Sequence, residues 1–206
     1  MLHKTPSLRE TPSQTAGPYV HIGMTPNFCG ITGVYSADPG ATMINGAVEG
    51  ERIALAIRII DGAGAPVGDG VVEIWQADAN GSFVAPMSPN SNSVPAFTGW
   101  GRQPANEQGV AAFETIKPGP APGPNGSLQA PHVLLWIVAR GINIGLQTRL
   151  YFADEAEANA TDYVLNRIPD PRRRQTLIAQ REDGAVPRYT LDIHLQGENE
   201  TVFFDV

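Results

Sequence analysis

Apolar residues recur at every second position in the last part of the chain, and this period predicts β-strands. Between residues 189 and 196, apolar side chains from Tyr189 to Leu195 alternate with polar ones, as in a strand with one buried face. The segment 132–139 is apolar almost throughout, which predicts a strand buried on both faces. Shorter apolar runs predict further strands at residues 52–60, 71–77, 110–116, 149–153 and 201–206.

Two short helices and mostly short connections complete the predicted pattern. Asp154, with Glu157 three residues on, has the form of a capping box, and Asp170-Pro171 places proline at the first position of a second helix. Most connections are too short for crossover helices, so we expect antiparallel sheets. The predicted fold class is all-β: an antiparallel β-sandwich with long loops, an extended N-terminal arm and two short helices.

Residues 1–50 show little periodicity and form the predicted arm. Prolines and a glycine between residues 12 and 18 impose extended and turn geometry there, and such an arm docks either on its own domain or on a neighbouring chain. Residues 84–109 are a second long loop-like segment, and loops of this length are often functional. We expect one domain over residues 1–206, with the arm and loops in 1–50 and the sandwich core in 51–206.

The composition agrees with a β protein that contains many turns. Apolar residues make up 42% of the chain, enough for a core, and 22 glycines and 18 prolines are spread between the apolar runs. The formal net charge is -7 and no basic stripe offsets it, so nucleic acid is not expected as a partner. The dense basic run Arg172-Arg173-Arg174 is either the solvated face of a short helix or a contact surface for an acidic partner subunit.

The sequence also indicates a compartment. Cys29 is the only cysteine, so a framework of intrachain disulfides is excluded, as is usual in a reducing compartment. Residues 1–10 are polar, and no stretch approaches the roughly 20 apolar residues of a membrane-spanning helix. We therefore expect a cytoplasmic protein that does not associate with membranes.

A search for catalytic motifs finds none that the chain could use alone. The four histidines, His3, His21, His132 and His194, are far apart in sequence, and no metal-binding pair, nucleophile elbow or nucleotide loop is present. His132 opens the most apolar predicted strand. It is interpreted either as a hydrogen-bonded histidine at the edge of the core or as a metal ligand whose partners the neighbouring sequence does not supply.

Several segments, in order along the chain, together resemble a known family. They are TPSQT (11–15), GPYVHIG (17–23), VEIWQADANG (72–81), TIKPG (115–119), APH (130–132), ARGINI (139–144), TRLYF (148–152) and QGENETVFFD (196–205). By their order and number, the chain resembles the intradiol ring-cleaving dioxygenases over nearly its whole length from residue 11. The resemblance implies a β-sandwich that serves the opening of a catechol ring by O2.

The resemblance also implies that the catalytic iron belongs to another chain. In this family two tyrosinates and two histidines ligate a ferric ion, and in two-chain members all four come from the beta chain. The matching positions here are Phe83, Ala121, His132 and Leu134, of which only His132 has a donor atom. Anionic oxygen ligands stabilise Fe(III). We therefore expect no cofactor in this chain and Fe(III) in a homologous beta chain.

By the same resemblance, this chain contributes to a shared pocket for a small aromatic acid and O2, without a catalytic residue of its own. The implied pocket residues are Thr15, Gly17, Pro18, Tyr19 and Arg140. A guanidinium at Arg140 would favour an anionic aromatic substrate or product. The alternatives are an interface or surface ion pair for Arg140 and ordinary packing of the arm for Tyr19.

Two other functions remain open from the sequence. One is a stand-alone β-sandwich module that binds small molecules in a pocket near His132 and Phe83. The other is an independent enzyme that uses a different metal or a catalytic triad assembled across space. The first would be a stable monomer without affinity for a beta chain, and the second would lose its activity when His132 is replaced.

Overall fold

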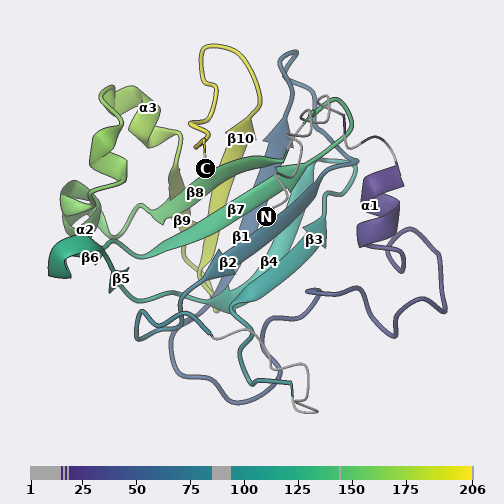
Figure 1. Ribbon diagram of the computed structural model, residues 1–206, viewed down its shortest axis with the longest axis horizontal. Helices are drawn as coiled ribbons and strands as arrows, with labels where there is room; N and C mark the ends of the chain where they lie inside the picture. Colours follow the sequence, from purple (N-terminus) through teal and green to yellow (C-terminus); the bar gives the residue numbers. More distant parts are fainter. Residues whose placement is uncertain (1–14, 16, 18, 85–93, 144, 206) are drawn as a thin grey trace, which may run out of the picture.

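The strands form two layers around a shared apolar core (Figure 1). The computed structural model describes residues 15, 17, 19–84, 94–143 and 145–205. Eight strands are hydrogen-bonded in the order β3-β2-β7-β8-β9-β10-β1-β4. Their bounds are β1 Arg52–Ile60, β2 Val71–Gln76, β3 Trp100–Pro104, β4 Val110–Ile116, β7 His132–Val138, β8 Leu146–Phe152, β9 Ile178–Glu182 and β10 Arg188–His194.

The remaining elements are short. Two-residue strands β5 (Ala121–Pro122) and β6 (Leu128–Gln129) pair with each other and flank a 3-10 turn, η1 (Pro124–Gly126). The helices are α1 (Tyr19–Met24), α2 (Ala156–Thr161) and α3 (Pro171–Gln175), with a second 3-10 turn, η2 (Leu165–Arg167). Across the described ranges, none of the helices has the length and apolar character needed to cross a lipid bilayer.

The core lies between the half-sheet β3-β2-β7-β8 and the half-sheet β9-β10-β1-β4. One continuous cluster of buried side chains joins them, including Ile57 on β1, Ile74 on β2, Leu135 on β7 and Leu191 on β10. The predicted alternation in residues 189–196 is confirmed, because Tyr189, Leu191 and Ile193 are buried while their neighbours are not. The all-β sandwich predicted from the sequence is therefore confirmed.

Two strand pairings correct the expectation of purely antiparallel sheets. β1 pairs with β10 in parallel, and β8 pairs with β9 in parallel. The chain between β8 and β9 holds α2, η2 and α3, which is long enough to return to the same end of the sheet. The first and last long strands are far apart in sequence, so loop length gave no information on their direction.

Several predicted elements differ from the observed ones. Residues 201–206 form no described strand, although Phe204 bridges Gln147. The predicted loop 84–109 contains β3, an edge strand that ends in Pro104, where a missing N–H costs no ladder hydrogen bond. β9 and α1 were not predicted, because each has only five or six residues and little periodicity.

The capping box predicted at Asp154 is also corrected. α2 starts at Ala156 after Glu155, and no side chain caps it. The Asp154 carboxylate instead lies 2.8 Å from Lys117 Nζ and accepts a hydrogen bond from the Tyr189 hydroxyl at 2.9 Å. The second predicted helix start is confirmed, since Asp170 accepts a hydrogen bond from the backbone of Arg172 at the start of α3.

Candidate functional site

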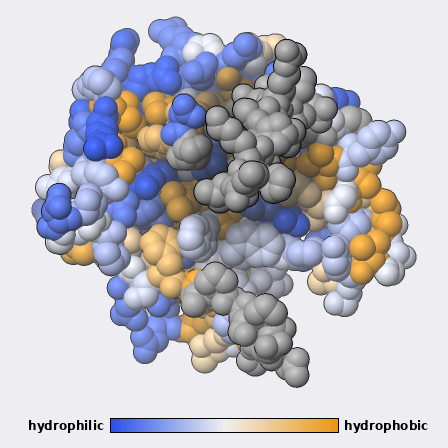
Figure 2. Space-filling view, in the orientation of Figure 1, coloured by the Kyte–Doolittle hydropathy of each residue, from blue (hydrophilic) through white to orange (hydrophobic). Residues whose placement is uncertain are grey.

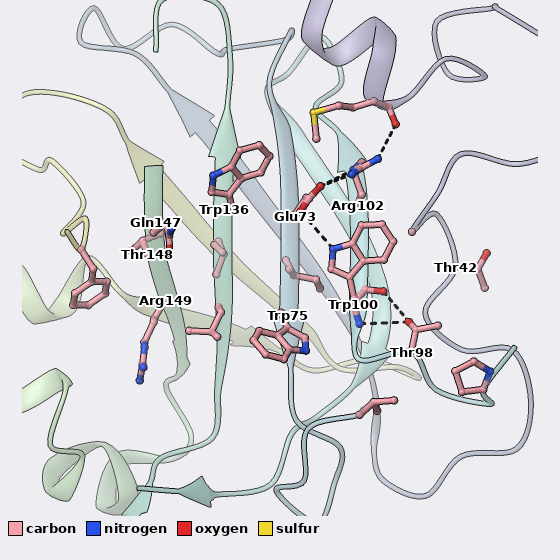
Figure 3. Close-up of a pocket in the computed structure, with 18 of the residues that line it drawn as sticks. Thr42, Glu73, Trp75, Thr98, Trp100, Arg102, Trp136, Gln147, Thr148 and Arg149 are labelled. Atoms are coloured by element: carbon pink, nitrogen blue, oxygen red, sulfur yellow. Dashed lines mark hydrogen bonds and ion pairs between the residues drawn. The ribbon is translucent and has the colours of Figure 1, made fainter. Parts of the chain in front are cut away.

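A wide groove lies on the outer face of the half-sheet β3-β2-β7-β8 (Figure 3). Its volume is about 1180 Å³, and all three tryptophans of the chain line it, so we name it the tryptophan groove. Trp100, Trp75, Leu134 and Arg149 form a row across the four strands, because each is paired in register with the next. The sequence prediction that β7 is buried on both faces is therefore wrong: its outer face lines this groove and is half-buried.

Three of the four positions that match iron ligands in the family lie near one end of the groove. His132 and Leu134 share the outer face of β7, since residues two apart on a strand point the same way. Leu134 pairs with Trp75, and the Phe83 ring lies 5.0 Å from the Trp75 ring. These side chains meet where β2 ends and β7 begins.

The fourth position, Ala121, is buried and follows a segment that packs against the turn after β2. Gly119 N donates a hydrogen bond to Asp78 O at 2.9 Å. Gly81 has φ of +80°, and a Cβ there would collide with the carbonyl oxygen of Pro120. Only glycine fits this close approach, which fixes the chain before Phe83 against the chain before Ala121.

His132 is buried and hydrogen-bonded within its own chain. Its Nδ1 lies 2.7 Å from the carbonyl oxygen of Ala130, which can only accept, so Nδ1 carries the proton. Burial, and next the positive charge of Arg149, lower the pKa of His132 below its ordinary value. His132 is therefore a neutral imidazole, as expected of a hydrogen-bonded histidine at the edge of the core.

Tyr151 lies beside His132, with their ring centroids 5.8 Å apart. Its hydroxyl donates to Asp162 Oδ1 at 3.1 Å, and Arg149 donates to the same hydroxyl at 3.3 Å. Burial raises the pKa of Tyr151 well above its ordinary value, so the side chain remains a phenol. A protonated phenol already committed to a carboxylate is a poor metal ligand.

The side chains at these positions do not fit a ferric ion. Phe83, Ala121 and Leu134 have no donor atom, and the surviving imidazole is a single neutral ligand. Within the part of the chain that the structure describes, no group of three or more His, Cys, Asp or Glu side chains could hold a metal ion. The anionic oxygen donors that stabilise Fe(III) are absent from these four positions.

Two of the residues expected to line a shared pocket, Thr15 and Arg140, lie at the opposite end of β7. The Thr15 hydroxyl accepts a hydrogen bond from Gly141 N at 3.0 Å, which brings the arm to the turn that carries Arg140. Gly17 adopts φ of +68°, and Tyr19, which begins α1, is 79% exposed. Pro18 lies outside the described residues.

Arg140 is mostly exposed and is ion-paired. Its Nε lies 3.2 Å from Asp69 Oδ2, and 69% of its side chain is accessible. Arg140 follows the end of β7, whereas His132 starts that strand. At ~3.3 Å per residue these positions are separated by about 20 Å or more. Arg140 and Thr15 therefore lie together, away from this chain's own degenerate metal site.

Sequence reasoning missed the groove and its charged residues. Trp75 and Trp136 sit at positions that look like interior strand positions, and their half-exposure depends on what covers the sheet. One signal was available. Trp75 and Trp136 fall inside predicted strands and Trp100 starts the observed strand β3, and all three lie on one face of the sheet. Arg149 and Asp162 were missed because their partners come from other strands and loops.

Comparisons with known proteins agree on one family. A family model described as Dioxygenase matches residues 24–197. A protocatechuate 3,4-dioxygenase alpha chain from Pseudomonas putida is 45% identical over 200 residues, which cover 96% of this chain and 97% of that protein. The alpha chain from Burkholderia cepacia is 38% identical over 204 residues, which cover 97% of this chain and 99% of that protein.

More distant relatives extend the comparison. A protocatechuate 3,4-dioxygenase beta chain from Burkholderia cepacia is 31% identical over 170 residues, which cover 76% of this chain and 69% of that protein. Among solved structures, a catechol 1,2-dioxygenase from Acinetobacter sp. ADP1 matches with a TM-score of 0.58 at 19% identity, over 75% of this chain and 55% of that chain. At that identity the likeness to the solved structure concerns the fold.

Proposed function

This chain belongs to the dioxygenase family, and we propose that it is the iron-free alpha subunit of a protocatechuate 3,4-dioxygenase. It pairs with a homologous beta chain that holds Fe(III). The αβ complex cleaves 3,4-dihydroxybenzoate with O2 between its two hydroxyl-bearing carbons to give 3-carboxy-cis,cis-muconate. Two alpha chains that are 45% and 38% identical over nearly the whole chain, together with the weaker match to a beta chain, support this assignment.

The observation that carries the proposal is the loss of donor atoms at the ligand positions. Phe83, Ala121 and Leu134 replace three ligands, and the fourth, His132, is neutral and hydrogen-bonded to its own backbone. A chain of this family that lacks an iron site acts only where another chain supplies one. The function is thus that of a subunit.

The arm and the turn after β7 are the proposed contribution to the partner's pocket. Thr15, Gly17, Pro18 and Tyr19 would form its edge, and the exposed guanidinium of Arg140 would bind the carboxylate of the substrate or product. Their distance from this chain's degenerate site supports a role in the site of another chain. Asp69, paired with Arg140, would limit its motion.

Exposed apolar side chains near the arm support contact with a partner chain. Tyr19, Phe28, Ile31, Val34 and Tyr35 are all large, apolar and exposed. Figure 2 shows hydrophobic residues gathered on the side of the molecule where Figure 1 places α1 and the segment that follows it. Exposed apolar surface of this kind is typical of an interface with another protein.

Co-expression with a beta chain tests the proposal. The complex is expected to co-purify, to show the colour of ferric tyrosinate and to consume O2 with 3,4-dihydroxybenzoate, whereas this chain alone is colourless and inactive. In the complex, Arg140→Gln is expected to raise KM for 3,4-dihydroxybenzoate by about tenfold, since loss of one charge-assisted hydrogen bond is worth about 1.4 kcal/mol.

Arg58→Gln is the matched control, because Arg58 is ion-paired with Asp192 on the other half-sheet and lies far from Arg140 in the strand order. Ring cleavage and stoichiometric iron in the isolated chain would refute the subunit role. An Arg140→Gln complex with the KM of wild type would refute the role of Arg140 alone.

A further inference from the structure

We propose that Asp69 is a positioning residue for Arg140: it holds one edge of the Arg140 guanidinium, so that the other edge faces the pocket shared with the beta chain. Asp69 has this role only if the proposed function holds, because Arg140 is the residue that would bind the carboxylate of the substrate or product there. Three features support the role: the register of β2 and β7, the turn that holds the Arg140 backbone and the burial of one Asp69 oxygen.

Strand pairing brings the two residues together. Val71, the first residue of β2, is paired with Val138, the last residue of β7, and the two strands are antiparallel. Asp69 precedes Val71 by two positions and Arg140 follows Val138 by two. The same register, continued past the ends of the strands, sets Asp69 and Arg140 opposite each other. Their side chains meet there, with Arg140 Nε 3.2 Å from Asp69 Oδ2.

The backbone of Arg140 is held by a tight turn. Ile142 N donates a hydrogen bond to Ala139 O at 3.2 Å, and Gly141 has φ of +88°. With Arg140 at the second position and glycine at a positive φ at the third, the segment has the pattern of a type II turn. The Thr15 hydroxyl accepts a hydrogen bond from Gly141 N at 3.0 Å, which fixes the turn against the arm. Arg140 therefore leaves a defined point of the backbone, and only its long side chain remains to be ordered.

Asp69 orders that side chain from one edge. A guanidinium is a planar fork, and a carboxylate binds either the edge that contains Nε or the edge formed by the two Nη atoms. Asp69 Oδ2 lies against Nε; this oxygen is buried and accepts no hydrogen bond from any described residue, so the guanidinium compensates its charge. Among the same residues, no second carboxylate lies within 4.0 Å of the Arg140 guanidinium. The edge formed by the two Nη atoms is left for the carboxylate of a ligand.

The contribution of the pair lies in preorganisation rather than in stability. The accessible fractions of the Arg140 and Asp69 side chains are 69% and 21%, and ion pairs this exposed stabilise a folded chain weakly. An arginine loses the freedom of a long side chain when it binds a ligand, and an arginine that is already ordered loses less. Releasing one such side chain is expected to weaken binding about threefold to tenfold.

Steady-state kinetics of the co-expressed αβ complex test the role. Asp69→Ala is expected to raise KM for 3,4-dihydroxybenzoate about threefold to tenfold and to leave kcat unchanged, because Arg140 would bind the carboxylate alike in the ground state and the transition state. Asp69→Asn keeps an acceptor oxygen beside Nε and should stay closer to wild type. Asp61→Ala is the matched control: Asp61 lies in the same connection between β1 and β2, but its carboxylate accepts hydrogen bonds from the backbone of Ala63 and Ala65, so KM should not change.

A double-mutant cycle separates positioning from a general structural effect. If Asp69 acts through Arg140, Asp69→Ala has no further effect on KM once Arg140→Gln is present, whereas a structural effect would persist in that background. Thermal unfolding identifies a folding defect. If Asp69→Ala does not fold, Asp69→Ser, whose side chain is likewise too short to reach Nε, replaces it in the cycle.

The order of the Arg140 side chain is measured directly on the isolated full chain. Nitrogen NMR relaxation of Arg140 Nε, identified by the loss of its signal in Arg140→Gln, should show a restrained side chain in wild type and a mobile one in Asp69→Ala. Asp61→Ala should resemble wild type. Thermal unfolding of the isolated Asp69→Ala chain should differ little from wild type, since the ion pair is exposed.

Three results would overturn the proposal: an unchanged or lowered KM for Asp69→Ala in an active complex, an equal rise of KM when Asp69→Ala is added to Arg140→Gln, or an Arg140 Nε that is as mobile in wild type as in Asp69→Ala. A lowered KM would mean that Asp69 acts by its negative charge, which opposes an anionic ligand. An inactive complex, or iron in this chain alone, would instead refute the proposed function, and the NMR measurement would still decide whether Asp69 orders Arg140.

Discussion

His132 occupies the one ligand position that retains a donor atom, and its surroundings give it a structural role. Its Nδ1–H bonds to Ala130 O, and its ring lies beside Tyr151. The sequence could predict a hydrogen-bonded histidine at the core edge, because the strand that it opens is so apolar. It could not predict Tyr151 or Arg149 as neighbours, since these come from β8, and the pairing of strands is not encoded locally.

His132→Ala is expected to leave the turnover of the co-expressed complex unchanged while destabilising this chain. Loss of a buried hydrogen bond costs about 1–3 kcal/mol of unfolding free energy. Denaturant unfolding measures the loss, and oxygen uptake measures turnover. Loss of turnover in a folded variant would show that His132 takes part in catalysis.

The same variant has a pH signature. The pKa of His132 is lowered in the folded chain, so the unfolded state binds the proton more tightly. Its contribution to stability is therefore intact above the unfolded pKa of about 6.5 and declines as pH falls below it. As the pH is lowered from about 7.5 to about 5, across that pKa, the difference in unfolding free energy between wild type and His132→Ala should shrink. A difference that grows towards low pH would contradict this assignment.

At the scale of elements, the crossover between β8 and β9 is anchored by one carboxylate. Asp162 is fully buried and accepts hydrogen bonds from the backbone of Ala130, Val164 and Leu165 and from the Tyr151 hydroxyl. It ties η2 to the chain that enters β7. The sequence indicated helices in this segment from Asp170-Pro171, but nothing in its pattern identified Asp162, because its partners are spread over the fold.

Asp162→Ala is expected to lower the free energy of unfolding by about 3–5 kcal/mol, since several buried donors lose their acceptor together. Asp162→Asn, which keeps one acceptor oxygen, should lose less. Asp170→Ala is the control: this residue caps α3 at the surface and should have a clearly smaller effect. Chemical denaturation of the three variants provides the comparison. Equal losses for Asp162→Ala and Asp170→Ala would show that burial of this network contributes little.

The parallel pairings mark the limit of element prediction. Runs of apolar residues identified β1, β2, β4, β7 and β8, and a period of two identified β10, whose buried and less buried residues alternate. β3 and β9 are short edge or linking strands whose pairing depends on their neighbours. The candidate site shows the same limit. The sequence could identify site residues inside the segments that resemble the family, but the tryptophan groove forms only when β3, β2, β7 and β8 lie side by side.

At the scale of the whole molecule, the two ends of β7 have different roles. At the end that starts with His132 lie three of the positions that match iron ligands, and of these only His132 has a donor atom. The other end leads to Arg140 and to the arm residue Thr15, which is bonded to Gly141. This division is what a subunit requires if it supplies pocket residues to a partner but no metal ligands of its own.

The iron content of the purified, active αβ complex tests this account most directly. Elemental analysis together with quantified protein should give one iron per αβ pair, and this chain, separated from the complex, should carry none. Replacing a tyrosine or histidine ligand in the beta chain should remove the iron and the colour completely. Two irons per pair, or iron that stays with this chain, would contradict the account.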